Sequence, residues 1–343
     1  MTNWEDLADR AIRDEPPSAT EGVSVLRAGE GEFLPVLHAA FRVRRHFHGK
    51  TVKIHVLLNA KSGLCPEDCG FCSQSSVAED PVEKYRLLSG AEMVAAARKA
   101  REHKAWKFCI VTSTRGPSER ELDTICAAVR EIKRDVGIRV CTSLGNLRED
   151  QARRLKEAGV DRFNHNLETS ERRFPEVCTT HTYQDRWNTV QLVQKAGMEA
   201  CSGGIVGMGE SDEEIVEIAF AARRTGATSI PVNFLDPRPG TPFAHLKPPE
   251  PWKCLMVLSL FRFVNPARDI RIAGGRETNL RSLQPLALWP CNSIFTGGYL
   301  TTPGNAPNAD HQMIRDAGFE ILEDYVTPQS AVSGQPSASE AVS

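Results

Sequence analysis

Three cysteines within eight residues give the strongest chemical signal in the sequence. Cys65, Cys69 and Cys72 have the spacing C-x-x-x-C-x-x-C, with Gly63 and Gly70 beside them. Three thiolates this close together can bind three corners of a [4Fe–4S] cube, and glycines let the chain wrap around a bulky cofactor. We therefore predict that this segment is a loop that binds an iron–sulfur cluster.

The fourth iron of such a cube would have no protein thiolate, and that open position favours a particular chemistry. It could accept the amino and carboxylate groups of S-adenosylmethionine, whose cleavage by one electron gives a 5′-deoxyadenosyl radical that removes hydrogen from unactivated carbon. The alternative is a zinc-binding interaction module. Zinc usually takes four ligands, and no fourth Cys or His stands next to the triplet, so this alternative fits less well.

Four further residues suggest a second metal site. Cys109, Cys141 and Cys201 each lie in a short β-rich run, and Arg271 lies in another. One cysteine in a strand is usually a packing residue, but three at comparable positions could bind a smaller cluster if they face inward. Arg271 would then be the fourth partner. Because a guanidinium is protonated below pH ~12, charge pairing with an anionic cluster is the alternative role for Arg271.

The elements that must position these residues follow a βα rhythm of about thirty residues from residue 50 onward. Ser89, Ser118 and Ser211 each stand three residues before a Glu and an apolar periodic run, which is typical of a helix start. Eight units predict an α/β fold, a (β/α)8 TIM-type barrel whose functional residues lie where strands end. A three-quarter barrel closed by a loop is the alternative. The predicted strands are 52–58, 107–112, 138–142, 161–166, 199–203, 229–234, 270–273 and 293–297.

The two ends of the chain differ from this central part. We expect residues 1–45 to form an N-terminal helical cap and residues 46–326 to form the barrel, with a further helix and strand over 310–326. Residues 327–343 are rich in Ser, Pro, Ala and Gln and have little to bury, which predicts a disordered tail.

Composition points to a protein that acts on a small ligand. Lys and Arg number 42 against 44 Asp and Glu, so a net charge of −2 gives no global attraction to nucleic acid or to an anionic membrane. No stretch approaches the ~18 apolar residues of a membrane span, and residues 1–13 are unlike a secretory signal. We expect a soluble, cytoplasmic protein. Its ten cysteines should then be ligands or buried residues, with Cys126 and Cys254 on apolar helix faces.

With these motifs in place, the sequence resembles the biotin synthase family of radical S-adenosylmethionine enzymes. The resemblance runs from about residue 45 to 315 and is most specific over residues 55–75, 163–170, 201–210, 232–235 and 292–295. It implies a homodimer that inserts sulfur between C6 and C9 of dethiobiotin to form biotin. Electrons would come from a flavodoxin- or ferredoxin-type donor that docks near the cysteine triplet.

The resemblance also assigns the metal ligands. It implies that Cys65, Cys69 and Cys72 bind the [4Fe–4S] cluster to which S-adenosylmethionine binds. It further implies an auxiliary [2Fe–2S] cluster that donates the sulfur, with the ligands Cys109, Cys141, Cys201 and Arg271. Cys178 and Cys291 match no ligand position, and we interpret both as free structural thiols.

The remaining matched positions concern the two small molecules. Asn164, Asn166 and Asn233 match positions that bind the ureido ring or the nucleoside, and a carboxamide offers both a donor and an acceptor to a urea. Glu168, where the family often has Asp, matches a ribose-hydroxyl acceptor. The resemblance implies that a glycine-rich segment flanks the adenine. The cofactor-binding positions are Asn166, Glu168, Gly203, Ile205, Gly207 and Glu210.

Another radical S-adenosylmethionine enzyme on the same barrel is the nearest alternative function. A lipoyl-type sulfur-inserting enzyme would need a second, N-terminal cysteine motif, and residues 1–64 contain no cysteine. A mutase-like relative would have no use for three strand cysteines together with Arg271. Both alternatives therefore explain less of the sequence than sulfur insertion does.

Overall fold

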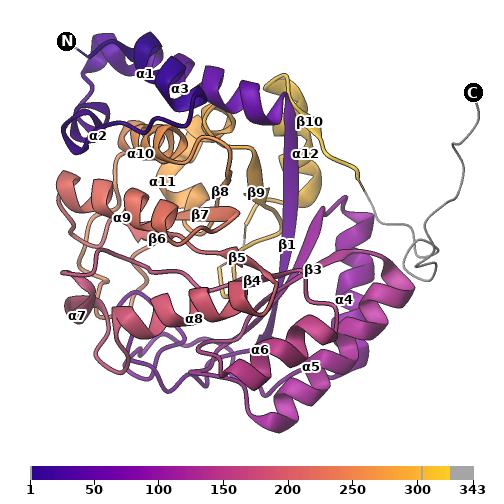
Figure 1. The fold of residues 1–343 in the computed structure, drawn as a ribbon. Helices are drawn as coiled ribbons and strands as arrows, with labels where there is room; N and C mark the ends of the chain where they lie inside the picture. Colours follow the sequence, from indigo (N-terminus) through magenta and orange to yellow (C-terminus); the bar gives the residue numbers. More distant parts are fainter. Residues whose placement is uncertain (1, 303, 325–343) are drawn as a thin grey trace, which may run out of the picture.

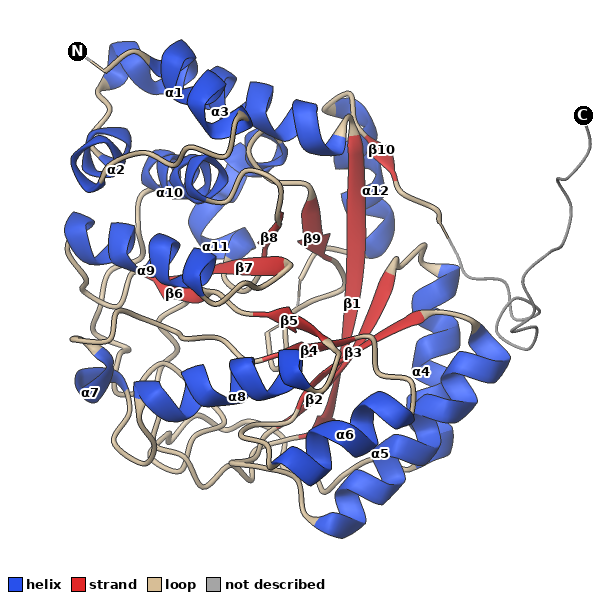
Figure 2. Cartoon of the chain, in the orientation of Figure 1, coloured by secondary structure: helices blue, strands red, loops and turns tan. Residues whose placement is uncertain are grey.

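The central element is a closed parallel barrel. A computed structural model describes residues 2–302 and 304–324, and Figures 1 and 2 show its strands surrounded by helices. Each barrel strand pairs in parallel with its neighbours, and the last pairs with the first, so the (β/α)8 prediction is confirmed and the three-quarter barrel is excluded. The barrel strands are β1 (Thr51–Lys61), β2 (Lys107–Thr112), β3 (Arg139–Ser143), β4 (Arg162–Asn164), β5 (Glu199–Cys201), β7 (Ser229–Phe234), β8 (Asp269–Ile272) and β9 (Ser293–Phe295).

The fifth barrel strand is interrupted. β5 is followed after two residues by β6 (Gly204–Val206), and both pieces pair with β7. A Cβ atom at Gly203 would overlap the carbonyl oxygen of Pro231, so only glycine allows the two strands to approach this closely. The segment after β4 is held against β6, because Ile205 N–H donates to the carbonyl of Glu168 at 2.7 Å. This irregular edge gives Glu168 its left-handed backbone, with φ of 69°.

Helices cover the outside of the barrel and bury two apolar clusters against it. The predicted starts at Ser89, Ser118 and Ser211 are confirmed, because each is the N-cap of a helix with a complete capping box. Cys126 and Cys254 are buried in these clusters, as expected. The helices are α4 (Gly90–Glu102), α5 (Glu119–Glu131), α6 (Glu149–Glu157), α7 (Phe174–Val177), α8 (Tyr183–Lys195), α9 (Asp212–Arg224), α10 (Pro251–Val264), α11 (Arg276–Leu280) and α12 (Pro307–Asp316).

Three N-terminal helices form the predicted cap. They are α1 (Trp4–Ile12), α2 (Ala19–Leu26) and α3 (Phe33–His48), and they pack against α9 and α10 (Figure 1). Cys291 is fully buried near this cap, where its carbonyl accepts a hydrogen bond from Arg44. That environment agrees with the structural thiol that we expected. The division of the chain at residue 45 stays a prediction, since α3 runs three residues beyond it.

The C-terminal part contains the expected helix and strand. After α12, β10 (Glu320–Ile321) pairs in parallel with the beginning of β1, outside the barrel. The predicted disordered tail, residues 327–343, lies outside the described residues. Within the described part of the chain, no helix is long and apolar enough to cross a membrane.

Candidate cluster and substrate site

A cavity of about 320 Å³ opens at the carboxyl ends of the barrel strands. Its wall contains side chains from β1, β2, β3, β4, β6, β7, β8 and β9, together with the loop that follows β1. The size lies within the range of small-molecule sites, and this end of a parallel barrel is where such sites form. The predicted functional residues on this wall are Cys65, Cys69, Cys72, Cys109, Cys141, Asn164, Asn166, Glu168, Ile205, Asn233 and Arg271.

The cysteine triplet lies on the loop after β1, as predicted. Hydrogen bonds inside the loop fold it back on itself, from Cys72 N–H to the carbonyl of Cys69 and from Ser76 N–H to that of Glu67. Burial raises the pKa of Cys65 and raises that of Cys72 to about 11. Both thiols therefore keep their protons near neutral pH, and metal binding must displace them. Three thiols on one cavity wall suit a cube whose fourth corner faces a ligand.

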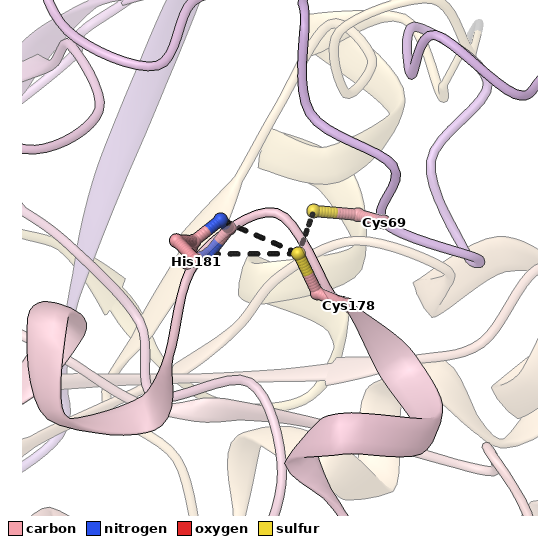
Figure 3. Close-up of side chains that lie close together, drawn as sticks. All are labelled: Cys69, Cys178 and His181. Atoms are coloured by element: carbon pink, nitrogen blue, oxygen red, sulfur yellow. Dashed lines mark hydrogen bonds between the residues drawn. The ribbon is translucent and has the colours of Figure 1, made fainter.

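A fourth thiol lies next to this loop, which the sequence analysis did not anticipate. Figure 3 shows Cys178 between Cys69 and His181. The sulfur atoms of Cys69 and Cys178 lie 3.7 Å apart. These three side chains could form a metal site by proximity alone. His181 already has other partners, however, since Nδ1 lies 2.6 Å from Glu67 Oε2 and Nε2 accepts from Arg186 at 2.9 Å. The ring therefore has no free nitrogen for zinc.

The second group of cysteines also comes together, deeper in the barrel. Cys109 and Cys141 are partners in the register of β2 and β3, so the two residues lie side by side on neighbouring strands. Arg271 on β8 donates from Nη2 to the sulfur of Cys201 at 2.6 Å. All four side chains are buried. These strand residues therefore meet the condition of facing inward, and the donor set of soft thiols with one cation suits a small anionic cluster, whose binding here stays a prediction.

His55 on β1 holds the guanidinium of Arg271 toward these thiols. Burial lowers the pKa of His55 well below its usual range, so the ring is neutral, and Nδ1 accepts from Arg271 Nη1 at 2.9 Å. Burial acts to lower the pKa of Arg271, whereas the neighbouring Cys201 and Cys109 act to raise it. The two cysteines outweigh burial, so the pKa of Arg271 lies above its usual value. Arg271 therefore remains a cation in contact with sulfur.

A layer of charged side chains fills the barrel below the strand cysteines. Arg162 is buried and pairs with Glu199 at 2.7 Å, and Lys53 pairs with Asp269 at 2.7 Å. Lys107 is also buried. We call the set Lys53, Lys107, Arg162, Glu199 and Asp269 the charged floor. Three cations against two carboxylates leave this floor positive, which favours an anionic group above it.

Sequence reasoning missed the charged floor, although a signal was present. Lys107 stands two residues before Cys109, Arg162 two before Asn164, and Asp269 two before Arg271. Side chains two apart in a strand point to the same face. Charged residues at that spacing before inward-facing ligands therefore mark a charged layer inside the barrel.

The three asparagine side chains line the same cavity wall. Asn164 Nδ2 donates to Asn166 Oδ1 at 3.1 Å and lies 3.3 Å from the sulfur of Cys201. Asn233 is bound at both ends, donating to the carbonyl of Gly204 and accepting from Gly274 N–H at 2.8 Å. One N–H and one lone pair of Asn233 remain for a ligand.

Glu168 is the clearest sign of a bound polar ligand. Its carboxylate is buried, and Oε1 accepts from Arg186 Nη1 at 3.2 Å. Oε2 is buried without a hydrogen-bond partner among the described residues, and Glu168 lines the cavity. An unpaired buried acceptor costs free energy unless a ligand satisfies it, and a pair of ribose hydroxyls has the matching donors.

The glycine-rich segment contributes mainly shape. Of the four positions matched in it, Ile205 lines the cavity, whereas Gly203, Gly207 and Glu210 do not belong to the lining formed by the described residues. Gly207 has φ of 109°, and its N–H donates to the carboxylate of Glu210. These contacts fix the turn after β6, and any contact with adenine stays a prediction.

Comparison with known proteins agrees with this geometry. The profile of the Radical SAM superfamily matches residues 61–222, and that of the Biotin and Thiamin Synthesis associated domain matches residues 231–320. The fold is similar to that of methylornithine synthase (PylB), with a TM-score of 0.82 at 15% identity over 95% of this chain and 99% of that chain. The hydrogenase maturase HydG superposes with a TM-score of 0.81 at 14% identity over 96% of this chain and 77% of that chain. Barrel, thiol triplet and profile together define a radical S-adenosylmethionine enzyme.

Sequence relatives specify the family. A biotin synthase from Bacillus pumilus (strain SAFR-032) is 51% identical over 321 residues, which cover 94% of this chain and 97% of the relative. One from Bacillus subtilis (strain 168) is 47% identical over 94% of this chain and 96% of the relative. The chain belongs to the biotin synthase family, and S-adenosylmethionine and a [4Fe–4S] cluster are its cofactors.

Proposed function

We propose that this enzyme inserts sulfur between C6 and C9 of dethiobiotin to form biotin, and that the sulfur comes from an auxiliary [2Fe–2S] cluster. The observation that carries the proposal is the presence of two separate thiol groups in one barrel interior. The triplet lies on a loop at the cavity wall, and the strand cysteines with Arg271 lie deeper. One group can serve radical formation and the other sulfur donation.

Cys65, Cys69 and Cys72 would hold the [4Fe–4S] cluster. When bound, this cluster supplies the electron that cleaves S-adenosylmethionine and so gives the radical that removes hydrogen from carbon. The unpaired Oε2 of Glu168 would accept the ribose hydroxyls, and Arg186 keeps that carboxylate in place. Asn166 and Ile205 would complete the nucleoside contacts, with Gly203, Gly207 and Glu210 fixing the turn that supports them.

Asn164, Asn166 and Asn233 would bind the ureido ring of dethiobiotin. Asn164 lies 3.3 Å from the sulfur of Cys201, so a ring held by these amides would have its carbon atoms close to the auxiliary site. Apolar side chains in the cavity wall, such as Phe71, Phe234 and Phe295, would exclude the water that quenches radicals.

Cys109, Cys141, Cys201 and Arg271 would hold the [2Fe–2S] cluster. The neighbouring Cys141 thiol lowers the pKa of Cys109 despite burial, whereas Cys109 raises the pKa of Cys141, so one thiolate of the pair is favoured for binding iron. Two interactions would retain an anionic cluster here, namely the Arg271 cation held by His55 and the positive charged floor. Sulfur would leave this site to bond each carbon in turn, so the cluster would be consumed.

The partners follow from the family resemblance. We propose a flavodoxin- or ferredoxin-type donor that docks near the triplet loop, a homodimeric assembly and a cytoplasmic location. Size-exclusion chromatography with light scattering would measure the assembly, and a monomer at micromolar concentration would contradict it.

Anaerobic reconstitution with iron and sulfide, followed by a single turnover with dethiobiotin, tests the function. We expect two kinds of cluster, 5′-deoxyadenosine and biotin. Zinc without sulfide would reject the cluster assignment, and a cube alone would reject the sulfur donor. Clusters with no 5′-deoxyadenosine in the presence of dethiobiotin would favour another radical S-adenosylmethionine enzyme on this barrel.

A further inference from the structure

Cys178 lies beside the proposed ligand Cys69, and the proposed reaction assigns no role to Cys178. Their sulfur atoms lie 3.7 Å apart although the residues are 109 positions apart in the chain. This separation is close to van der Waals contact, and a disulfide needs about 2.05 Å. Bond formation would therefore require the two side chains to approach further, with no rearrangement of distant parts of the chain.

The backbones on both sides of this pair are held together. Gly70 N–H donates to the carbonyl of Val177 at 2.9 Å on one side. On the other side, the carboxylate of Asp68 accepts from the backbone N–H groups of Thr179 and Thr180 at 2.9 and 3.2 Å. Hydrogen bonds that flank both cysteines keep the thiols facing each other and favour a link between them over links to other cysteines.

Both thiols are buried, with Cys69 7% exposed, and they differ in their position relative to the cavity. Cys69 lines the cavity, so a small solute that enters the cavity reaches it first. Cys178 is 3% exposed and does not belong to the cavity wall formed by the described residues. Its sulfur lies 3.1 Å from Asp68 Oδ1. His181 Nδ1 lies 3.3 Å from the same sulfur, and Figure 3 shows this side chain beside Cys178. The pair thus places one thiol at the cavity wall and the other next to it, outside the wall formed by the described residues, so that Cys178 can act as a resolving partner once Cys69 is oxidised.

We propose that Cys178 is a resolving thiol that protects Cys69 when Cys69 is not bound to iron. A peroxide would oxidise the Cys69 thiol to a sulfenic acid and release water. The Cys178 thiol would then attack that sulfur, form the Cys69–Cys178 disulfide and release a second water. Two electrons pass from the two thiols to the peroxide. A dithiol reductant restores both thiols, so a cluster ligand is kept from irreversible oxidation. The protective role rests on the proposed assignment of Cys69 as a ligand.

Peptide mapping of the full-length chain tests the bond directly. The chain is stripped of iron by a chelator without oxygen, treated with hydrogen peroxide, alkylated and digested with trypsin without reduction. Trypsin leaves the triplet on residues 62–84 and Cys178 on residues 174–186. We expect a linked pair of these peptides, with the bond at Cys69. A link confined to residues 62–84, or a free Cys178 after oxidation of Cys69, would overturn the proposal.

Two variants test whether Cys178 protects Cys69 from irreversible oxidation. In Cys178→Ser we expect Cys69 to reach the sulfinic or sulfonic state, and we expect most of the iron reloading after dithiothreitol to be lost. Cys291→Ser, also a buried cysteine but near the N-terminal cap, should reload like the parent chain. Equal recovery of iron in Cys178→Ser and the parent chain would contradict protection.

The same peroxide treatment of enzyme that carries its clusters distinguishes a failure of this inference from a failure of the proposed function. If Cys69 is a ligand, the cluster should delay the disulfide. A disulfide that forms at the same rate with and without cluster would reject Cys69 as a ligand while leaving the thiol pair intact.

Discussion

The two thiol groups of this barrel are built in opposite ways. Cys65, Cys69 and Cys72 lie on a loop, and their surroundings are mainly hydrogen bonds within that loop and to residues 177–181. The strand cysteines are fixed by the barrel register and stand above a positive charged floor. A loop can wrap a cube and leave one iron open to a ligand, whereas strands and buried charges can retain a cluster that must give up sulfur. The difference suggests that each group can be disabled without the other.

The largest expected effect separates the two groups completely. Cys65→Ala should lose the cube and all 5′-deoxyadenosine, because two thiolates cannot hold it. Cys201→Ala should abolish biotin yet keep the cube and some 5′-deoxyadenosine. Electron paramagnetic resonance and product chromatography measure both outcomes. Cys254→Ala, in the apolar core, is the matched control. Loss of both clusters in Cys201→Ala would contradict the claim that the two thiol groups can be disabled separately.

A smaller effect should follow removal of one cation from the charged floor. Arg162→Met leaves Glu199 paired with Lys107 and Asp269 paired with Lys53, so the carboxylates keep partners. We expect the auxiliary cluster to lose acid-labile sulfide faster in the presence of a chelator, while the cube is unchanged. Arg154→Met, on the surface, controls for loss of charge. Equal sulfide loss in Arg162→Met and the parent chain would show that the floor does not retain the cluster.

A change at His55 should sharpen the comparison further. His55→Phe removes the acceptor for Arg271 and should shift the visible absorption and reduction potential of the auxiliary cluster alone. His55→Asn offers an acceptor again and should restore part of the shift. If His55 only fills space, His55→Phe should change the absorption and the reduction potential no more than His55→Asn does. That result would contradict a positioning role for His55.

The smallest expected effect concerns Glu168, which faces S-adenosylmethionine in our proposal. Glu168→Gln should raise KM for S-adenosylmethionine by at least about tenfold, because a hydrogen bond to a charged group contributes about 1.5–3 kcal/mol. Glu168→Asp should raise it less, since the carboxylate remains. Steady-state kinetics at saturating dethiobiotin measure both. An unchanged KM in Glu168→Gln would remove this residue from the nucleoside site.

Much of this organisation was predictable, and the physical reasons are local. The alternation of β-rich and amphipathic runs predicted the eight strands, and Ser–Glu pairs predicted three helix starts. Strand cysteines could be expected to converge, because parallel strands bring equivalent positions to one level. The contact between Cys69 and Cys178 could not be predicted, since it depends on how two loops 109 residues apart pack. The left-handed backbone of Glu168 depends on the interrupted edge beside β6, which no local pattern encodes.

The origin of the inserted sulfur tests the central claim most directly. The chain is reconstituted with heavy-isotope sulfide, freed of unbound sulfide and allowed one turnover with dethiobiotin. The two-site account predicts biotin that carries the heavy isotope, with none formed by Cys201→Ala. Biotin that carries only light sulfur would contradict it, because the sulfur would then come from outside the barrel.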